Sequence, residues 1–152
     1  MNKTGKIFYE ILTLVWSTIF TVVTEEVSFA NGSSPLCENR HMGTVFTIVT
    51  ESFNAAICGQ ENTDPQCSLT LEPYVYIGQS RKTRESIVLS ATDETQDSPF
   101  IMIYKAKNNN YTYQMSSSGG YTLKPWTSLS VFKNGKRIYY RKLNKYNGEY
   151  DC

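Results

Sequence analysis

Short segments in which apolar and polar residues alternate follow one another along the chain from residue 44, with polar turn sequences between them. Alternation of this kind is typical of strands that bury one face of a sheet. Within residues 31–152 no apolar spacing indicates an amphipathic helix over three turns. Strands are therefore expected at residues 44–50, 69–77, 85–91, 100–105, 111–115 and in both arms of 128–142.

The turn sequences support these assignments. Asn134-Gly135 lies between two alternating apolar runs and indicates a tight hairpin, because both residues readily take positive φ. The polar run 107–110, Lys-Asn-Asn-Asn, joins the two strands around it as a second hairpin, since asparagine tolerates the left-handed region.

Two segments are harder to interpret. Residues 51–58 are taken as a continuation or bend of the preceding strand because their apolar residues alternate, although Thr50 is also a suitable cap for a short helix. Pro73 places the strand 69–77 at a sheet edge or beside a bulge, because proline has no N–H to donate. The whole pattern predicts one all-β domain over residues 31–152, a small antiparallel sandwich or barrel of roughly seven or eight strands tied by disulfides.

Residues 1–30 have the layout of a secretory signal peptide. Lys3 and Lys6 precede the apolar run 11–23, which is shorter than the roughly 20 residues of a membrane span. Ser28 and Ala30 are the small residues that suit a cleavage point after Ala30. The acidic residues of the leader depart from this layout, and an uncleaved N-terminal anchor is the alternative. We expect a secreted or periplasmic protein with no transmembrane segment after residue 30.

All four cysteines follow the predicted leader, and an even number in a short exported chain indicates disulfides. Three pairings can be drawn. We favour Cys58–Cys67, which closes a polar loop, together with Cys37–Cys152, which joins the two ends of the mature chain. The chain has no Cys-x-x-Cys and a single histidine, so no metal site is expected.

Charge is unevenly distributed. Residues 31–100 carry 4 basic and 9 acidic side chains, whereas residues 101–152 carry 9 basic and 2 acidic ones. Such asymmetry indicates either a basic binding face or two sides of one fold that attract each other. The basic residues around the predicted hairpin tip include Lys133, Lys136, Arg137 and Arg141. An anionic partner such as a cell-envelope polymer would bind there; alternatively, the charges keep an edge strand from pairing with other chains.

Tyrosine is the unusual part of the composition, and ten of the eleven tyrosines follow the leader. Tyr111 and Tyr113 are two residues apart, as are Tyr74 and Tyr76, so each pair shows one side of its strand. A row of tyrosines can bind sugars or peptides, or it packs across the strands of a small domain. An exported chain rarely meets nucleic acid, so no nucleic-acid partner is expected.

Few residues point to catalysis. His41 is the only histidine, so a Ser-His-Asp or Cys-His arrangement would depend on it. A hydrolase would need two carboxylates about 5–10 Å apart, and the candidates are Glu72 with Glu85, or the cluster 93–97, which a solvated loop also explains. Gly119-Gly120 precedes a strand rather than a helix, so no phosphate-binding loop is expected. We expect no cofactor and no enzymatic activity.

Three segments carry a resemblance to known proteins: PYVYIGQSRKTRESIVL, NYTYQM and LSVFKNGKRI. Their order over residues 44–142 resembles short secreted β-domain proteins of cyanobacterial type, a family with no assigned activity. Ser118-Gly119-Gly120-Tyr121 is also similar to the inhibitory loop of C-type periplasmic lysozyme inhibitors, which are small disulfide-tied β-barrels, but it is one residue shorter. That resemblance implies an inhibitor that inserts the loop 116–121, with Ser118, Gly119 and Tyr121, into a partner enzyme.

The function expected from the sequence is therefore that of an exported, non-enzymatic binding or structural protein. An enzyme inhibitor is the first alternative and a carboxylate-based hydrolase the second. The residues expected to bind a partner are Tyr111, Tyr113, Lys133, Lys136, Arg137 and Arg141.

Overall fold

A computed structural model of the chain describes residues 34–61, 71–95, 100–118, 122–146 and 148. Within these residues there are a short helix and eight strands. Their bounds are α1 Pro35–Glu38, β1 Gly43–Val49, β2 Phe53–Gln60, β3 Leu71–Ser80, β4 Ser86–Asp93, β5 Met102–Asn108, β6 Tyr111–Ser117, β7 Thr127–Lys133 and β8 Lys136–Leu143. The predicted leader, residues 1–30, lies outside the described residues.

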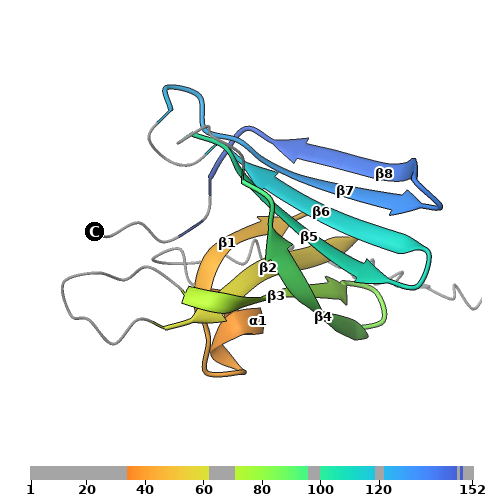
Figure 1. The fold of residues 1–152 in the computed structure, drawn as a ribbon, viewed down its shortest axis with the longest axis horizontal. Helices are drawn as coiled ribbons and strands as arrows, with labels where there is room; N and C mark the ends of the chain where they lie inside the picture. The colour runs from red at the N-terminus through yellow and green to blue at the C-terminus, as the bar shows by residue number, and fades with distance from the viewer. Residues whose placement is uncertain (1–33, 62–70, 96–99, 119–121, 147, 149–152) are drawn as a thin grey trace, which may run out of the picture.

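All eight strands form one antiparallel sheet in which each strand pairs with the next along the chain. The sheet curls into a half-barrel, with β1 to β4 below and β5 to β8 above in Figure 1. The prediction of an all-β, disulfide-tied fold is confirmed, and the architecture is the barrel-like one in an incompletely closed form.

The two predicted tight turns are confirmed. Asn134 and Gly135 both have positive φ, 50° and 76°, and Lys133 pairs with Lys136 across them. This is the conformation for which Asn-Gly is favoured in two-residue hairpins. In the second hairpin Asn109 takes a φ of 53°, so the turn is built on the left-handed tolerance of asparagine.

Residues 53–58 form a strand, as expected, but the interpretation that this strand continues or bends from the preceding one is wrong. The chain reverses at Thr50, and β2 runs back antiparallel to β1. The Thr50 hydroxyl accepts hydrogen bonds from the N–H groups of Ser52 and Phe53, at 3.3 and 2.9 Å, and a threonine side chain thus closes the turn without Gly, Pro or Asn. The prediction for Pro73 is confirmed, because it lies in β3 where the register with β2 is interrupted.

The concave face of the half-barrel holds the main core. Side chains two residues apart on each strand point inward, as expected from the alternation of the sequence. The buried members of this cluster are Phe46, Ile48, Ala55, Ile57, Tyr76, Tyr104, Ala106, Met115 and Leu129. Because they come from six of the eight strands, the curl of the sheet is what brings them together.

A second, smaller cluster lies on the convex face of β2 and β3, under α1. Cys37 of α1 forms a disulfide with Cys58 of β2, and Ala56 and Ile77 pack beside them. The favoured pairings Cys58–Cys67 and Cys37–Cys152 are therefore wrong. Loop lengths along the chain do not determine which cysteines pair. The observed bond forms because α1 packs against β2, which brings Cys37 beside Cys58. Cys67 and Cys152 lie outside the described residues.

The two edge strands, β1 and β8, face each other across the opening of the half-barrel, where side chains bridge the gap. Tyr146 donates a hydrogen bond to the Val45 carbonyl at 3.2 Å. Arg141 lies 3.4 Å from Glu51 in an exposed ion pair. Exposed pairs of this kind contribute little stability, so the edges are bridged but not firmly closed.

Candidate functional site

A cavity of about 400 Å³ opens into the concave side of the half-barrel. Its size falls within the range of about 300–1,000 Å³ in which proteins bind small molecules. Strands from both halves contribute to it, and its walls are mainly aromatic and aliphatic. The lining residues are Phe53, Tyr76, Gly78, Ser80, Glu85, Ser86, Ile87, Tyr111, Tyr113, Leu129, Val131, Ile138 and Tyr139.

Three tyrosines form a stack along one wall of this cavity. The ring centroids of Tyr76 and Tyr113 are 5.1 Å apart with an interplanar angle of 24°. Tyr111 continues the stack from Tyr113 at 6.5 Å and 23°. Since Tyr76 belongs to β3 and the other two to β6, the stack joins the two halves of the half-barrel. Tyr111 and Tyr113 face inward together, as their spacing predicts.

A second aromatic pair borders the cavity near the open edge. Phe53 at the start of β2 and Tyr139 of β8 meet edge to face, with centroids 5.7 Å apart. The Tyr139 hydroxyl lies 3.5 Å from the Thr50 hydroxyl, so this ring is held against the β1–β2 turn. The cavity therefore has aromatic rings on both of its sides.

The polar group that stands out in the cavity is the hydroxyl of Tyr76. This residue is 3% exposed and lines the cavity. Among the described residues its hydroxyl has no hydrogen-bond partner. The oxygen is not one of the fully buried unpartnered polar atoms, which are Thr47 Oγ1 and Asn54 Oδ1, so it can be reached from the cavity. Burial raises the pKa of Tyr76 well above its usual value, so the hydroxyl keeps its proton. It is a hydrogen-bond donor on a residue that lines the cavity.

Gly78 makes room for this hydroxyl. A Cβ placed on Gly78 would lie 2.7 Å from the Tyr76 hydroxyl oxygen and 3.1 Å from two of its ring atoms. Tyr76 and Gly78 are two residues apart on β3 and therefore share the concave face. The missing side chain at position 78 lets the tyrosine ring lie flat along the strand and leaves the space beyond it open.

The rim of the cavity is polar. Ser80, Glu85 and Ser86 come from the β3–β4 connection, and Glu85 accepts a hydrogen bond from the Thr83 hydroxyl at 3.1 Å. Of the described residues that line the cavity, Glu85 alone has an acidic or basic side chain of the Asp, Glu, Lys, Arg or His type. An apolar interior with a few polar groups is typical of a binding site.

The residues expected to bind a partner separate into two groups. Tyr111 and Tyr113 line the cavity, and the ammonium group of Lys133 lies 5.3 Å above the Tyr111 ring. The other three basic residues lie away from it. Lys136 is exposed at the start of β8, Arg137 lies 4.9 Å from the Tyr140 ring, and Arg141 pairs with Glu51. They do not form one site with the tyrosines.

Ser118, expected in an inhibitory loop, is 4% exposed and its polar groups face the protein. Its hydroxyl accepts a hydrogen bond from the Trp126 N–H at 2.9 Å, and its N–H donates to the Trp126 carbonyl at 3.0 Å. The hydroxyl thus closes the connection between β6 and β7. Gly119 and Tyr121 lie outside the described residues.

The carboxylates considered for a hydrolase do not meet. Glu72 and Glu85 lie at opposite ends of the β3–β4 pair, about 26 Å apart by the rise of a strand, since Glu85 lies opposite Ser80. Asp93 accepts a hydrogen bond from the Thr95 N–H, Glu94 pairs with Lys105, and Asp97 is not among the described residues.

His41 is exposed with a φ of 56°. In the described part of the chain no group of three or more His, Cys, Asp or Glu side chains could hold a metal ion.

Tyr76, Gly78, Phe53 and Tyr139 were not expected in the site from the sequence. The spacing of Tyr74 and Tyr76 does indicate a shared face, but their surroundings differ. Tyr74 packs edge to face on Tyr104 at 4.9 Å, away from the cavity. Only the curl of the sheet distinguishes the two residues.

No helix among the described residues has the length and apolar character needed to cross a membrane. No family model matches the chain, and no curated protein or solved structure matches it either.

Proposed function

We propose that this protein is an exported, non-enzymatic binding protein that holds a small, largely apolar molecule in the cavity of its half-barrel. The observation that carries the proposal is the Tyr76 hydroxyl, a donor on a side chain that is 3% exposed and that lines a cavity of about 400 Å³. A ligand with an apolar body and one hydrogen-bond acceptor satisfies both the cavity wall and this hydroxyl.

The lining supports binding rather than turnover. Acid–base catalysis requires a positioned proton donor or acceptor, usually as a pair. Among the described lining residues Glu85 is the single carboxylate, and it lies at the rim. The inhibitor alternative receives no support from Ser118, because its hydroxyl is used within the fold. Export is inferred from the leader and agrees with the Cys37–Cys58 disulfide.

Prodan, a neutral naphthalene with one carbonyl acceptor, is a suitable probe because its emission shifts to the blue in an apolar site. We expect saturable binding with a blue shift. Val131→Trp should abolish it by filling the cavity, whereas Phe132→Trp, the next residue on the opposite face of β7, should preserve it. Equal binding by both variants, or no saturable binding by the unaltered protein, would refute the proposal.

A further inference from the structure

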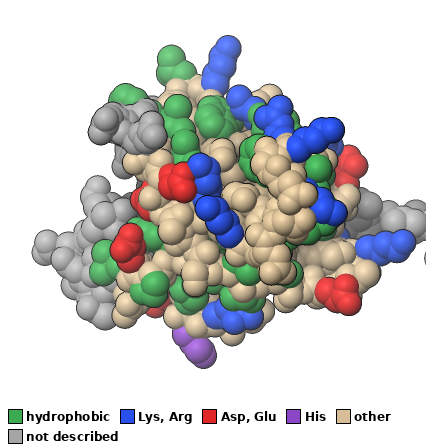
Figure 2. All heavy atoms as spheres, turned by 45° about the vertical axis from the view of Figure 1, so that its right-hand side comes forward, with side chains coloured by type: hydrophobic (Ala, Val, Ile, Leu, Met, Phe, Trp, Pro, Cys, Tyr) green, Lys and Arg blue, Asp and Glu red, His purple; other side chains and the backbone are tan. Residues whose placement is uncertain are grey.

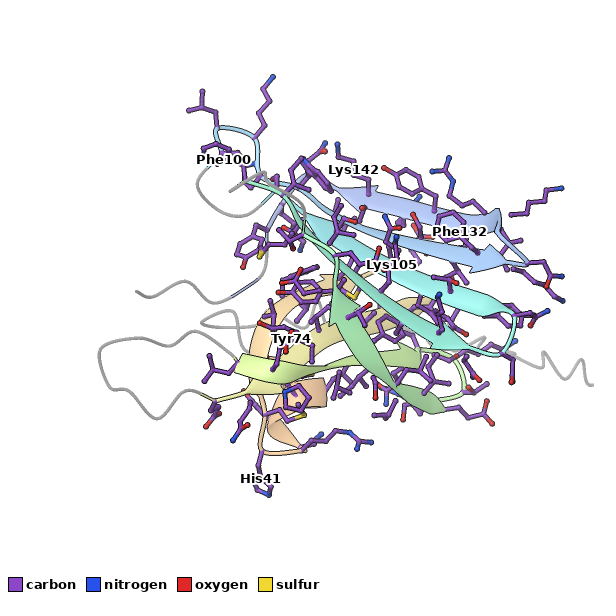
Figure 3. All side chains as sticks on the ribbon, viewed as in Figure 1. His41, Tyr74, Phe100, Lys105, Phe132 and Lys142 are labelled. Carbon is purple, nitrogen blue, oxygen red and sulfur yellow. A yellow bond between two sulfur atoms is a disulfide. The ribbon has the colours of Figure 1, made fainter. Side chains whose placement is uncertain are left out.

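The convex face of β5 to β8 is a second surface, and it belongs to a part of the chain that is rich in basic residues. Residues 100–146 contain nine Lys and Arg residues and no Asp or Glu. The strand alternation sends some of these side chains to the convex face, away from the cavity. Figure 3 shows Lys105, Phe132 and Lys142 on β5, β7 and β8 in the upper half of the molecule. Lys and Arg side chains gather in the upper part of Figure 2.

The register of these strands arranges the convex side chains in three rows across the sheet, each row taking one residue from each strand. The first row is Ile103, Ser116, Ser128 and Lys142; the second is Lys105, Gln114, Ser130 and Tyr140; the third is Lys107, Thr112, Phe132 and Arg137. Neighbouring rows are about 7 Å apart, since residues on one face are two strand positions apart. Every row contains at least one cation.

The centre of this face is made of short polar side chains. Ser116, Ser128 and Ser130 are each 6% exposed, and Gln114 donates a hydrogen bond to the Ser116 hydroxyl at 3.3 Å. The three serines are therefore covered by their neighbours, and the polar groups of this face that a partner can reach are the half-buried side chains of Thr112 and Gln114. Hydroxyl and amide groups both donate and accept hydrogen bonds, so they match the hydroxyl groups of a sugar.

Two of the cations lie over aromatic rings rather than against carboxylates. The Lys142 ammonium lies 4.6 Å from the Trp126 ring and the Arg137 guanidinium 4.9 Å from the Tyr140 ring. Lys105, in contrast, forms an ion pair with Glu94. A ring positions a cation without neutralising it, so Lys142 and Arg137 keep their charge for an anionic partner.

We infer that this convex face binds an anionic polysaccharide, with the exposed Lys107, Arg137 and Lys142 contacting its acidic groups and the half-buried Thr112 and Gln114 contacting its hydroxyl groups. Single-stranded nucleic acid fits less well, because stacking requires free ring faces and the Trp126 and Tyr140 rings each carry a cation. A membrane surface fits less well too, because the apolar members of the rows, Ile103 and Phe132, are both partly buried.

This inference is tested by measuring binding of the protein to immobilised polygalacturonate, with immobilised dextran as the neutral counterpart. The protein should bind polygalacturonate, with an affinity that falls as salt rises, and should not bind dextran. Lys107→Gln, Arg137→Gln and Lys142→Gln should each weaken binding about fivefold, the effect of losing one unit charge at contact distance in water. Lys82→Gln in the β3–β4 turn and Arg40→Gln beyond α1 change the net charge equally and should leave binding unchanged.

The inference is overturned if the two control variants weaken binding as much as the face variants, because the attraction would then come from overall charge. It is also overturned if oligothymidylate or vesicles of anionic lipid bind more tightly than polygalacturonate, or if dextran binds equally. Far-ultraviolet circular dichroism should show that each variant keeps its fold. Lys107 is exposed near the end of β5, so Lys107→Gln should still fold and report on binding if the other variants unfold. Prodan binding should be unaffected by the face variants, which keeps this test separate from that of the cavity.

Discussion

Tyr76 and Tyr113 stack with their ring centroids 5.1 Å apart although they belong to strands β3 and β6, which are not neighbours in the sheet. In a flat sheet two intervening strands would hold these strands about 14 Å apart. The contact thus exists because the sheet curls, and the same curl forms the cavity beside the rings. Stacking of aromatic rings adds about 0.5–1.5 kcal/mol beyond the area that they bury.

Tyr76→Phe should separate binding from stability. The hydroxyl has no partner among the described residues, so its removal should change the free energy of unfolding by less than about 0.5 kcal/mol. If the hydroxyl donates to the ligand, the affinity for prodan should fall about fivefold, the effect of one hydrogen bond. Urea denaturation and a fluorescence titration measure the two quantities.

Tyr104→Phe is the matched control. The Tyr104 hydroxyl is hydrogen-bonded to Tyr74 and Asp93, and Tyr104 is absent from the cavity lining. Its removal should destabilise the protein by about 1 kcal/mol and leave prodan binding unchanged. The opposite pattern, with loss of stability in Tyr76→Phe and loss of binding in Tyr104→Phe, would contradict the assignment of the cavity.

Gly78→Ala should reduce both stability and binding. The added methyl group would lie 2.7 Å from the Tyr76 hydroxyl oxygen, so the buried ring must shift. Forced shifts of this kind cost about 1–3 kcal/mol, and the displaced ring takes up cavity space. The double variant Gly78→Ala with Tyr76→Phe should recover part of the stability, because the closest contact is removed. Urea denaturation of the four proteins in this cycle measures the coupling, and strict additivity would show that the contact is unimportant.

Local signals in the sequence account for most of the fold. Asn134-Gly135 was identified because its dihedral preference needs no information from elsewhere in the chain. The reversal at Thr50 was missed because a threonine hydroxyl closes it, and no Gly, Pro or Asn marks it. Helix α1 has four residues, too few to show an apolar period, although Ser34 before Pro35 is a suitable start signal. Since the disulfide depends on where α1 lies, the pairing could not be derived either.

The candidate site was only partly predictable. Alternation places Tyr111 and Tyr113 on one face, and the structure confirms that both face the cavity. Which inward residues meet across the half-barrel depends on how far the sheet curls, and that is a property of all eight strands together. Tyr74 and Tyr76 have the same spacing, yet one packs in the core on Tyr104 and the other lines the cavity.

Alkaline pH should destabilise the protein through its buried tyrosines. Burial raises the pKa of Tyr76 in the folded state above the value of 10.0 that applies when it is unfolded. Its contribution is therefore fully present below pH 10 and is lost as the pH rises further, at about 1.4 kcal/mol per pH unit. Tyr76→Phe lacks this group, so it should match the unaltered protein at pH 7 and become the more stable of the two above pH 10. Urea midpoints at pH 7, 10 and 11 test this, and equal pH dependence of both proteins would contradict it.

The Cys37–Cys58 disulfide should contribute about 3 kcal/mol to stability, because it closes a loop with a sequence separation of 21 residues. The double variant Cys37→Ala with Cys58→Ala should show this loss in urea denaturation. Peptide mapping of the non-reduced protein should recover a linked pair of peptides that contain these two cysteines. Recovery of Cys58 linked to Cys67 would show that the arrangement of α1 on β2 is wrong.

Ser118→Ala tests whether the connection between β6 and β7 is structural. The hydroxyl accepts the Trp126 N–H at 2.9 Å and lies 3.2 Å from the Thr122 hydroxyl, in a residue that is 4% exposed. Its removal leaves a partly buried N–H without its partner, so we expect a loss of about 1–3 kcal/mol in the free energy of unfolding. Thr122→Ala is a milder control, because it removes one contact of the Ser118 hydroxyl and leaves the Trp126 N–H bonded.

If Ser118 served mainly to inhibit a lysozyme, its substitution would abolish inhibition at micromolar protein without changing stability. A stability loss in Ser118→Ala, together with no lysozyme inhibition by the unaltered protein, would assign the residue to the fold.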